Sequence, residues 1–228
     1  MSLWSSYSVE DFLLFSERTY WRLFELHNEA FWPAHLFALL AGLALVALLV
    51  RPRSWSGRGC GLILAVAWLV TAWSYFWQSY ATINWAAVYV APVFVAQALL
   101  LAALSGRLAL STPGRSERIV GLALLVWAVA LHPLLAAGSG RPLVGAEVFA
   151  LAPDPTAIAT LGLLVLAGGG WRRWLLLVVP AGWCGISAIV LLTLGSAQGW
   201  VPLAAAGLAL ATLASAVVRR QGVGSLSG

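Results

Sequence analysis

The sequence contains no lysine, and only 9% of its 228 residues are charged. A soluble domain typically carries about 25% charged residues, so this chain has too few charges to cover a water-facing surface. Hydrophobic residues make up 61% of the chain. The sequence therefore predicts a protein embedded in a lipid bilayer, and it leaves no room for a separate soluble catalytic domain.

Cysteine is scarce as well, since Cys60 and Cys184 are the two that the chain contains. They form neither a Cys-x-x-Cys pair nor a zinc-binding spacing, and we interpret both as small apolar packing residues. The sequence also lacks a phosphate-binding loop, a Gly-x-Ser-x-Gly elbow, a His-Glu-x-x-His motif and a dinucleotide fingerprint. These absences argue against an enzyme, and the sequence identifies no cofactor.

What the chain does contain is a series of apolar stretches near the roughly 20 residues that cross a bilayer core of about 30 Å. The fifth stretch is short, at about 15 residues or about 22 Å of helix. The predicted fold is all-α, a multi-pass membrane protein with about seven transmembrane helices. We place these helices at residues 31–50, 59–78, 85–104, 119–137, 156–168, 174–194 and 200–218.

The arginines alternate between the loops that join these stretches. Ten of the thirteen lie in the first, third and fifth loops and the C-terminal tail, whereas seven of the eight acidic residues fall on the other side. Arginine-rich loops remain in the cytoplasm, so the N-terminus is predicted outside and the C-terminus inside. The all-arginine basic set, with abundant Ala, Gly, Leu and Val, is typical of a high-GC bacterium. We therefore predict a bacterial cytoplasmic (inner) membrane location, and the net charge of +5 reflects orientation rather than nucleic-acid binding.

Residues 1–30 lack the basic start and the continuous apolar stretch of a signal peptide. They predict an amphipathic helix, which either lies flat at the outer interface or packs on a partner protein or on the outer loops. The chain would then consist of this helix, a transmembrane bundle over residues 31–220 and a flexible cytoplasmic tail over residues 221–228. The charged face of the helix carries Asp11, Arg18, Arg22, Glu25 and Glu29.

Ionisable residues in or near the spans are the first candidates for a functional site. The predicted topology brings His35, His132, Glu147 and Asp154 to the outer half of the bundle. Two histidines and two carboxylates could bind a metal or relay protons, and each histidine could ligate a haem or a pigment. We expect His132 to lie within reach of Asp154 or Glu147, or of a bound ligand. The alternative is that each histidine bonds locally, Asp154 caps the fifth helix and Glu147 is solvated.

Two functions fit this pattern. The first is a non-catalytic accessory or scaffold subunit of a larger membrane complex, for example one that carries pigments or redox cofactors. The second is a small-solute permease, which would need a polar path through the membrane midplane. Beyond the lipid bilayer, the expected partners are other membrane subunits. They would dock through the N-terminal helix or through the sixth transmembrane helix, where small residues permit close packing at Ala181, Gly182, Gly185 and Ser187.

Four stretches spread over nearly the whole chain also carry a family pattern. They read HNEAFWP at residues 27–33, YATINWAA at 80–87, HPLL at 132–135, and PDPT with LGLL at 153–156 and 161–164. In these stretches the chain resembles a bacterial family of uncharacterised multi-pass membrane proteins, known as a domain of unknown function. Some members are labelled transporter permeases. The resemblance implies a helical membrane fold.

Overall fold

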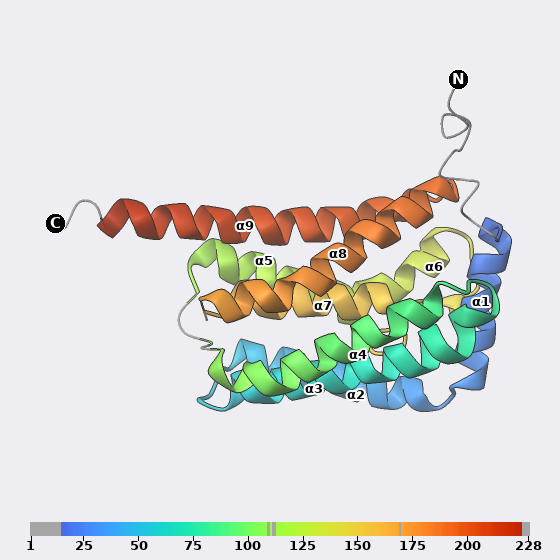
Figure 1. Ribbon diagram of the computed structural model, residues 1–228, viewed down its shortest axis with the longest axis horizontal. Helices are drawn as coiled ribbons and strands as arrows, with labels where there is room; N and C mark the ends of the chain where they lie inside the picture. Colours follow the sequence, from blue (N-terminus) through green and yellow to red (C-terminus); the bar gives the residue numbers. More distant parts are fainter. Residues whose placement is uncertain (1–14, 109, 111–112, 169, 225–228) are drawn as a thin grey trace, which may run out of the picture.

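The computed structural model describes residues 15–108, 110, 113–168 and 170–224, and over these residues the chain is all-helical (Figure 1). This confirms the predicted fold class. Most helices lie roughly along the long axis of the molecule, and α1 crosses one end of it. The α-helices are α1 (Glu17–Ala30), α2 (Ala34–Val50), α3 (Ser56–Val70), α4 (Ala87–Leu104), α5 (Arg115–Val126), α6 (Leu135–Gly138), α7 (Pro153–Leu166), α8 (Trp171–Thr193) and α9 (Trp200–Gly224).

Two of the long helices continue into π-helical segments, and short 3₁₀ turns lie in the connections and at helix ends. The π segments are η3 (Thr71–Ser79), which continues α3, and η6 (Trp127–Leu131), which continues α5. The 3₁₀ turns are η4 (Tyr80–Thr82), η5 (Ser105–Arg107), η7 (His132–Leu134), η8 (Leu143–Gly145) and η9 (Ala197–Gly199).

Five helical segments of 21 to 27 residues are long and apolar enough to cross a membrane. A sixth arises if α1 and α2, which meet at an angle of 94°, are taken together. Helix α7 has 14 residues and is too short, as its sequence suggested. These segments and α7 occupy the seven predicted stretches, whereas the number of true crossings and their orientation stay predictions.

Helix α1 is amphipathic, and its apolar face packs against the rest of the bundle. Ser16 caps its start by accepting a hydrogen bond from the Thr19 amide. Tyr20, Trp21 and Phe24 are buried against the rest of the protein. The charged face points the other way: Arg18, Arg22 and Glu29 are exposed, Glu25 is half-buried and pairs with Arg22, and Asp11 lies outside the described residues.

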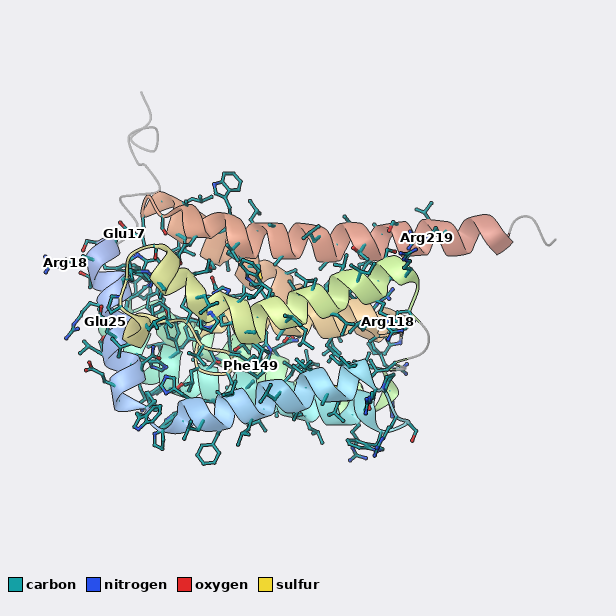
Figure 2. All side chains as sticks on the ribbon, turned by 180° about the vertical axis from the view of Figure 1, so that it is seen from behind. Glu17, Arg18, Glu25, Arg118, Phe149 and Arg219 are labelled. Carbon is teal, nitrogen blue, oxygen red and sulfur yellow. The ribbon has the colours of Figure 1, made fainter. Side chains whose placement is uncertain are left out.

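Arginine side chains lie at the end of the bundle opposite α1. Figure 2 shows Arg118 and Arg219 at the far end from Glu17, Arg18 and Glu25. The structure therefore separates the arginine-rich loops from α1 along the long axis, as expected for helices that alternate in direction between two ends.

Helix α7 forms the centre of the molecule, because all 14 of its residues are buried. It contacts α5 most extensively and is also packed by α3, α8 and α9. Apart from Asp154, Thr156 and Thr160 the helix is apolar on every side, and such a helix is stable only when other helices surround it. Because neighbouring helices cover α7 on all sides, it has no exposed hydrophilic face.

A close helix contact joins α5 to α7 through two glycines. A Cβ added at Gly162 would lie 2.8 Å from the Gly121 carbonyl oxygen, and one added at Gly121 would lie 2.9 Å from the Gly162 oxygen. The glycines of α8 behave differently, since a Cβ at Gly182 or Gly185 would meet nothing within 4 Å. Of the four small residues of the sixth predicted span, Gly182 and Gly185 therefore make no close contact within the described chain, whereas Ser187 is buried.

Candidate functional site: a buried histidine and two carboxylates

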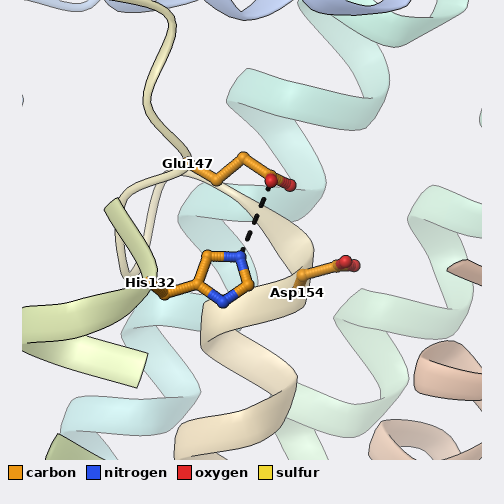
Figure 3. Close-up of side chains that lie close together, drawn as sticks. All are labelled: His132, Glu147 and Asp154. Atoms are coloured by element: carbon orange, nitrogen blue, oxygen red, sulfur yellow. Dashed lines mark ion pairs between the residues drawn. The ribbon is translucent and has the colours of Figure 1, made fainter. Parts of the chain in front are cut away.

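Three of the four predicted site residues lie together near the α1 end of the bundle. His132, Glu147 and Asp154 each offer one ligand atom, and these atoms all lie within 4.8 Å of one another. The His132 Nε2 and Glu147 Oε2 atoms are 3.6 Å apart (Figure 3). All three residues are almost completely buried, with exposed fractions of 2%, 3% and 1% respectively. The sequence placed them on one face of the membrane, and the fold brings them into one cluster.

A local departure from α-helical geometry positions His132. The π-helical turn Trp127–Leu131 comes immediately before it, and Pro133 follows it in the 3₁₀ turn His132–Leu134. A proline inside a helix removes one amide donor and crowds the carbonyl four residues earlier. The wider π turn accommodates this, and such turns often occur at functional sites.

Glu147 is carried by the connection between α6 and α7, which side chains from elsewhere hold in place. The Asn28 Nδ2 group of α1 donates hydrogen bonds to the Val144 oxygen at 2.6 Å and the Ala146 oxygen at 2.8 Å. Glu147 follows these two carbonyls directly. The α1 helix therefore fixes the backbone that presents this carboxylate.

A second anchor holds the same connection on the other side of Glu147. Ala150 adopts a left-handed conformation with φ of 67°, which is uncommon for a residue with a Cβ. Its amide donates to the Thr156 Oγ1 atom at 3.0 Å, and its carbonyl accepts from the Thr71 Oγ1 atom at 3.0 Å. These hydrogen bonds hold the strained turn in place between η3 and α7.

Asp154 does not cap α7, so the predicted N-cap role is wrong. The N-cap position is Ala152, and Asp154 lies in the first helical turn with its carboxylate directed into the protein. Its Oδ1 accepts from Trp183 Nε1 at 2.7 Å, and its Oδ2 accepts from Ser187 Oγ at 2.6 Å. A carboxylate near a helix N-terminus is favoured by the helix dipole, but these two donors from α8 determine where it points.

The fourth predicted residue, His35, is not a member of the cluster. Its Nε2 atom lies 3.1 Å from the Asn28 Oδ1 atom, so it orients the amide that holds the Glu147 connection. Its contribution to the cluster is indirect, through Asn28.

Several polar atoms of the cluster have no hydrogen-bond partner among the described residues. They are both ring nitrogens of His132 and the Oε1 atom of Glu147. Because Glu147 is only 3% exposed it is not solvated, contrary to the simpler interpretation of the sequence, and the His132 ring makes no hydrogen bond within the described part of the chain. Two carboxylates beside one imidazole would keep a net negative charge even if the imidazole were protonated, and an uncompensated buried charge is costly. The arrangement can hold either protons or a cation.

Residues 17–224 match the profile of DUF6064, a family of unknown function. The chain belongs to this family. The expected membership in a family of unknown function is thus confirmed, while the family description names neither a membrane location nor a permease activity. No curated protein and no solved structure matches the chain.

The DUF6064 match begins at the first residue of α1, and α1 contributes a residue that sequence reasoning missed. Asn28 lies in the HNEAFWP stretch, and the sequence indicates no role for it, yet it is 7% exposed and joins α1, His35 and the Glu147 connection. Trp183 and Ser187 were also missed as partners of Asp154. Their signal in the sequence is weak, because a serine or tryptophan within an apolar helix usually marks packing alone.

A third histidine, His27, lies on α1 and anchors this helix to the bundle. His27 Nδ1 lies 2.9 Å from the Ser79 Oγ atom, and the ring packs beside Tyr75. Burial lowers the pKa of His27 from 6.5 to about 4, because the charged imidazolium loses its hydration. The residue is therefore neutral in the folded protein at physiological pH.

Proposed function

We propose that this protein is a non-catalytic accessory or scaffold subunit of a larger membrane complex. In this proposal it is a multi-pass protein of the bacterial cytoplasmic membrane, with the α1 end outside and the arginine-rich end in the cytoplasm. The alternating arginines support the orientation, because positively charged loops are retained in the cytoplasm.

One observation carries the proposal, namely the composition of the buried helix α7. From Leu161 to its end at Leu166, every side chain is apolar and buried. The two threonines before this stretch use their hydroxyl groups within the protein: Thr156 donates to the Ala152 oxygen and Thr160 to the Thr156 oxygen. A carrier needs polar groups along a path through the midplane. The centre of this bundle supplies packing instead, which favours a structural role.

The outward face of α8 supports an association with other membrane subunits. Gly182 and Gly185 lie less than one helical turn apart on this helix, with open space where a Cβ would stand. Small residues let a second transmembrane helix approach closely, and packing is what drives helix association in lipid. We therefore propose that a helix of a partner subunit packs on this face, and that the exposed charged face of α1 is a second contact outside the membrane.

Purification in a mild detergent tests the proposal. We expect stable partner subunits to co-purify with the full chain, and the double variant Gly182→Leu, Gly185→Leu to lose them while it stays monodisperse and keeps its helical content. The matched control is Gly207→Leu, because a Cβ at Gly207 in α9 also meets nothing within 4 Å. A wild-type protein that purifies alone and monodisperse would contradict the proposal.

The second candidate function is a small-solute permease, and the buried cluster of His132, Glu147 and Asp154 favours it. Ionisable groups inside a membrane protein often mark an ion or proton pathway. Reconstitution into liposomes containing a pH-sensitive dye distinguishes the two functions. Proton movement that accompanies solute uptake in the wild type, and that is lost in Glu147→Gln, would favour the permease.

A further inference from the structure

We propose that His132, Glu147 and Asp154 bind one divalent transition-metal cation. The site is independent of the scaffold function proposed above. It joins three parts of the chain, since His132 follows α5, Glu147 lies in the connection after α6, and Asp154 lies in the first turn of α7 (Figure 3).

The distances suit a cation after small movements of the side chains. Because the three ligand atoms lie within 4.8 Å of one another, some point between them lies within about 2.8 Å of all three. Bonds from zinc to imidazole nitrogen or carboxylate oxygen are about 2.0–2.2 Å long. Each side chain would therefore move inward by less than about 1 Å, which rotations about side-chain bonds can supply.

The unpartnered atoms point to a missing ligand rather than to a self-contained cluster. Both ring nitrogens of His132 and the Oε1 atom of Glu147 are buried and lack hydrogen-bond partners among the described residues. Buried polar groups are normally satisfied. A cation would accept an electron pair from one His132 nitrogen and from Glu147, and so satisfy atoms that the protein itself leaves without a partner.

The charge of the cluster matches a divalent ion. Two ionised carboxylates carry two negative charges, and a neutral imidazole adds none. A divalent cation would make the group neutral, which lowers the cost of burying it. A monovalent cation or a single proton would leave one negative charge in an apolar interior.

The supporting hydrogen bonds resemble those that orient metal ligands. Trp183 and Ser187 each occupy one oxygen of Asp154, and every carboxylate oxygen keeps a further lone pair for a metal. Asn28 fixes the backbone before Glu147. One nitrogen with two carboxylates suits zinc, manganese or ferrous iron, whereas calcium and magnesium prefer oxygen ligands alone.

Metal analysis of the full-length protein in mild detergent tests the site. The protein is stripped with a chelator, loaded with Zn²⁺ or Mn²⁺ in separate samples, desalted, and assayed for bound metal and melting temperature. We expect about one ion per chain and a higher melting temperature in the loaded wild type. Glu147→Gln and Asp154→Asn remove one charge each with little change of shape, and we expect affinity to fall by at least about tenfold in each.

Glu117→Gln is the matched control, because Glu117 is also a buried carboxylate but belongs to the first turn of α5, outside the cluster. It should bind metal as the wild type does. X-ray absorption of the loaded wild type, which needs no variant to fold, should show one imidazole nitrogen among oxygen ligands. A wild type that binds no Zn²⁺ or Mn²⁺, a metal spectrum without nitrogen, or equal loss of metal in Glu117→Gln would each overturn the proposal.

Discussion

Asn28 is the residue through which α1 should stabilise the connection that carries Glu147, and Asn28→Ala tests this directly. The substitution removes two donated hydrogen bonds, to the Val144 and Ala146 oxygens, and the acceptor used by His35. Val144 is exposed, so water can replace the bond to its carbonyl. Ala146 is 5% exposed, so its carbonyl would be left buried without a partner.

The expected loss of stability follows from these two hydrogen bonds, one to an exposed and one to a buried residue. An exchangeable hydrogen bond contributes about 0.5–1.5 kcal/mol, and a buried group left without a partner costs about 1–3 kcal/mol. We therefore expect Asn28→Ala to lower the free energy of unfolding by about 2–4 kcal/mol. We also expect faster hydrogen exchange across residues 143–152, because this segment loses its anchor to α1.

Equilibrium unfolding by denaturant in detergent micelles measures the change, with Asn84→Ala as the control. Asn84 also makes two hydrogen bonds, to the Tyr80 hydroxyl and from the Ala86 amide, but it is partly exposed and its partners are local. Its loss should cost no more than about 1 kcal/mol. If the two variants lose the same stability, or if exchange over residues 143–152 is unchanged, α1 does not hold the Glu147 connection.

Three further outcomes are expected. Burial holds the pKa of His27 at about 4 in the folded state against 6.5 for a free histidine, so the stability that this residue contributes is complete above pH 6.5 and is lost as the pH falls towards 4. The unfolding free energy of the wild type should therefore fall by up to about 3 kcal/mol more than that of His27→Gln over this range, and parallel pH profiles would refute the assignment. Gly162→Ala should destabilise the protein by about 1–3 kcal/mol because its Cβ meets backbone of α5, whereas Gly182→Ala should be neutral or slightly stabilising in the same thermal unfolding assay. A reporter active only in the cytoplasm should be active when fused after Arg220 and silent when inserted at Asn84, and activity at Asn84 would refute the seven-span topology with an external N-terminus.

The hydrophobic runs and the capping and breaking residues were sufficient to predict an all-helical protein with apolar helices of membrane-spanning length. They also identified the short α7 and the amphipathic α1, because helix length and periodicity depend mainly on local sequence. The same local signals misassigned Asp154 as a cap. A proline-flanked aspartate is a common helix start, and nothing in the local sequence reveals that Trp183 and Ser187 hold its carboxylate.

The sequence alone determined which ionisable residues reach one end of the bundle, since hydropathy and arginine placement set the end at which each loop lies. It could not determine which of them meet. Only the tertiary structure separated His35 from the cluster and brought His132, Glu147 and Asp154 together. That outcome depends on the rotation of each helix about its axis, which is set by packing: the Gly121–Gly162 contact of α5 with α7, and the π turn before His132. These contacts join residues far apart in the chain, and no local pattern encodes them.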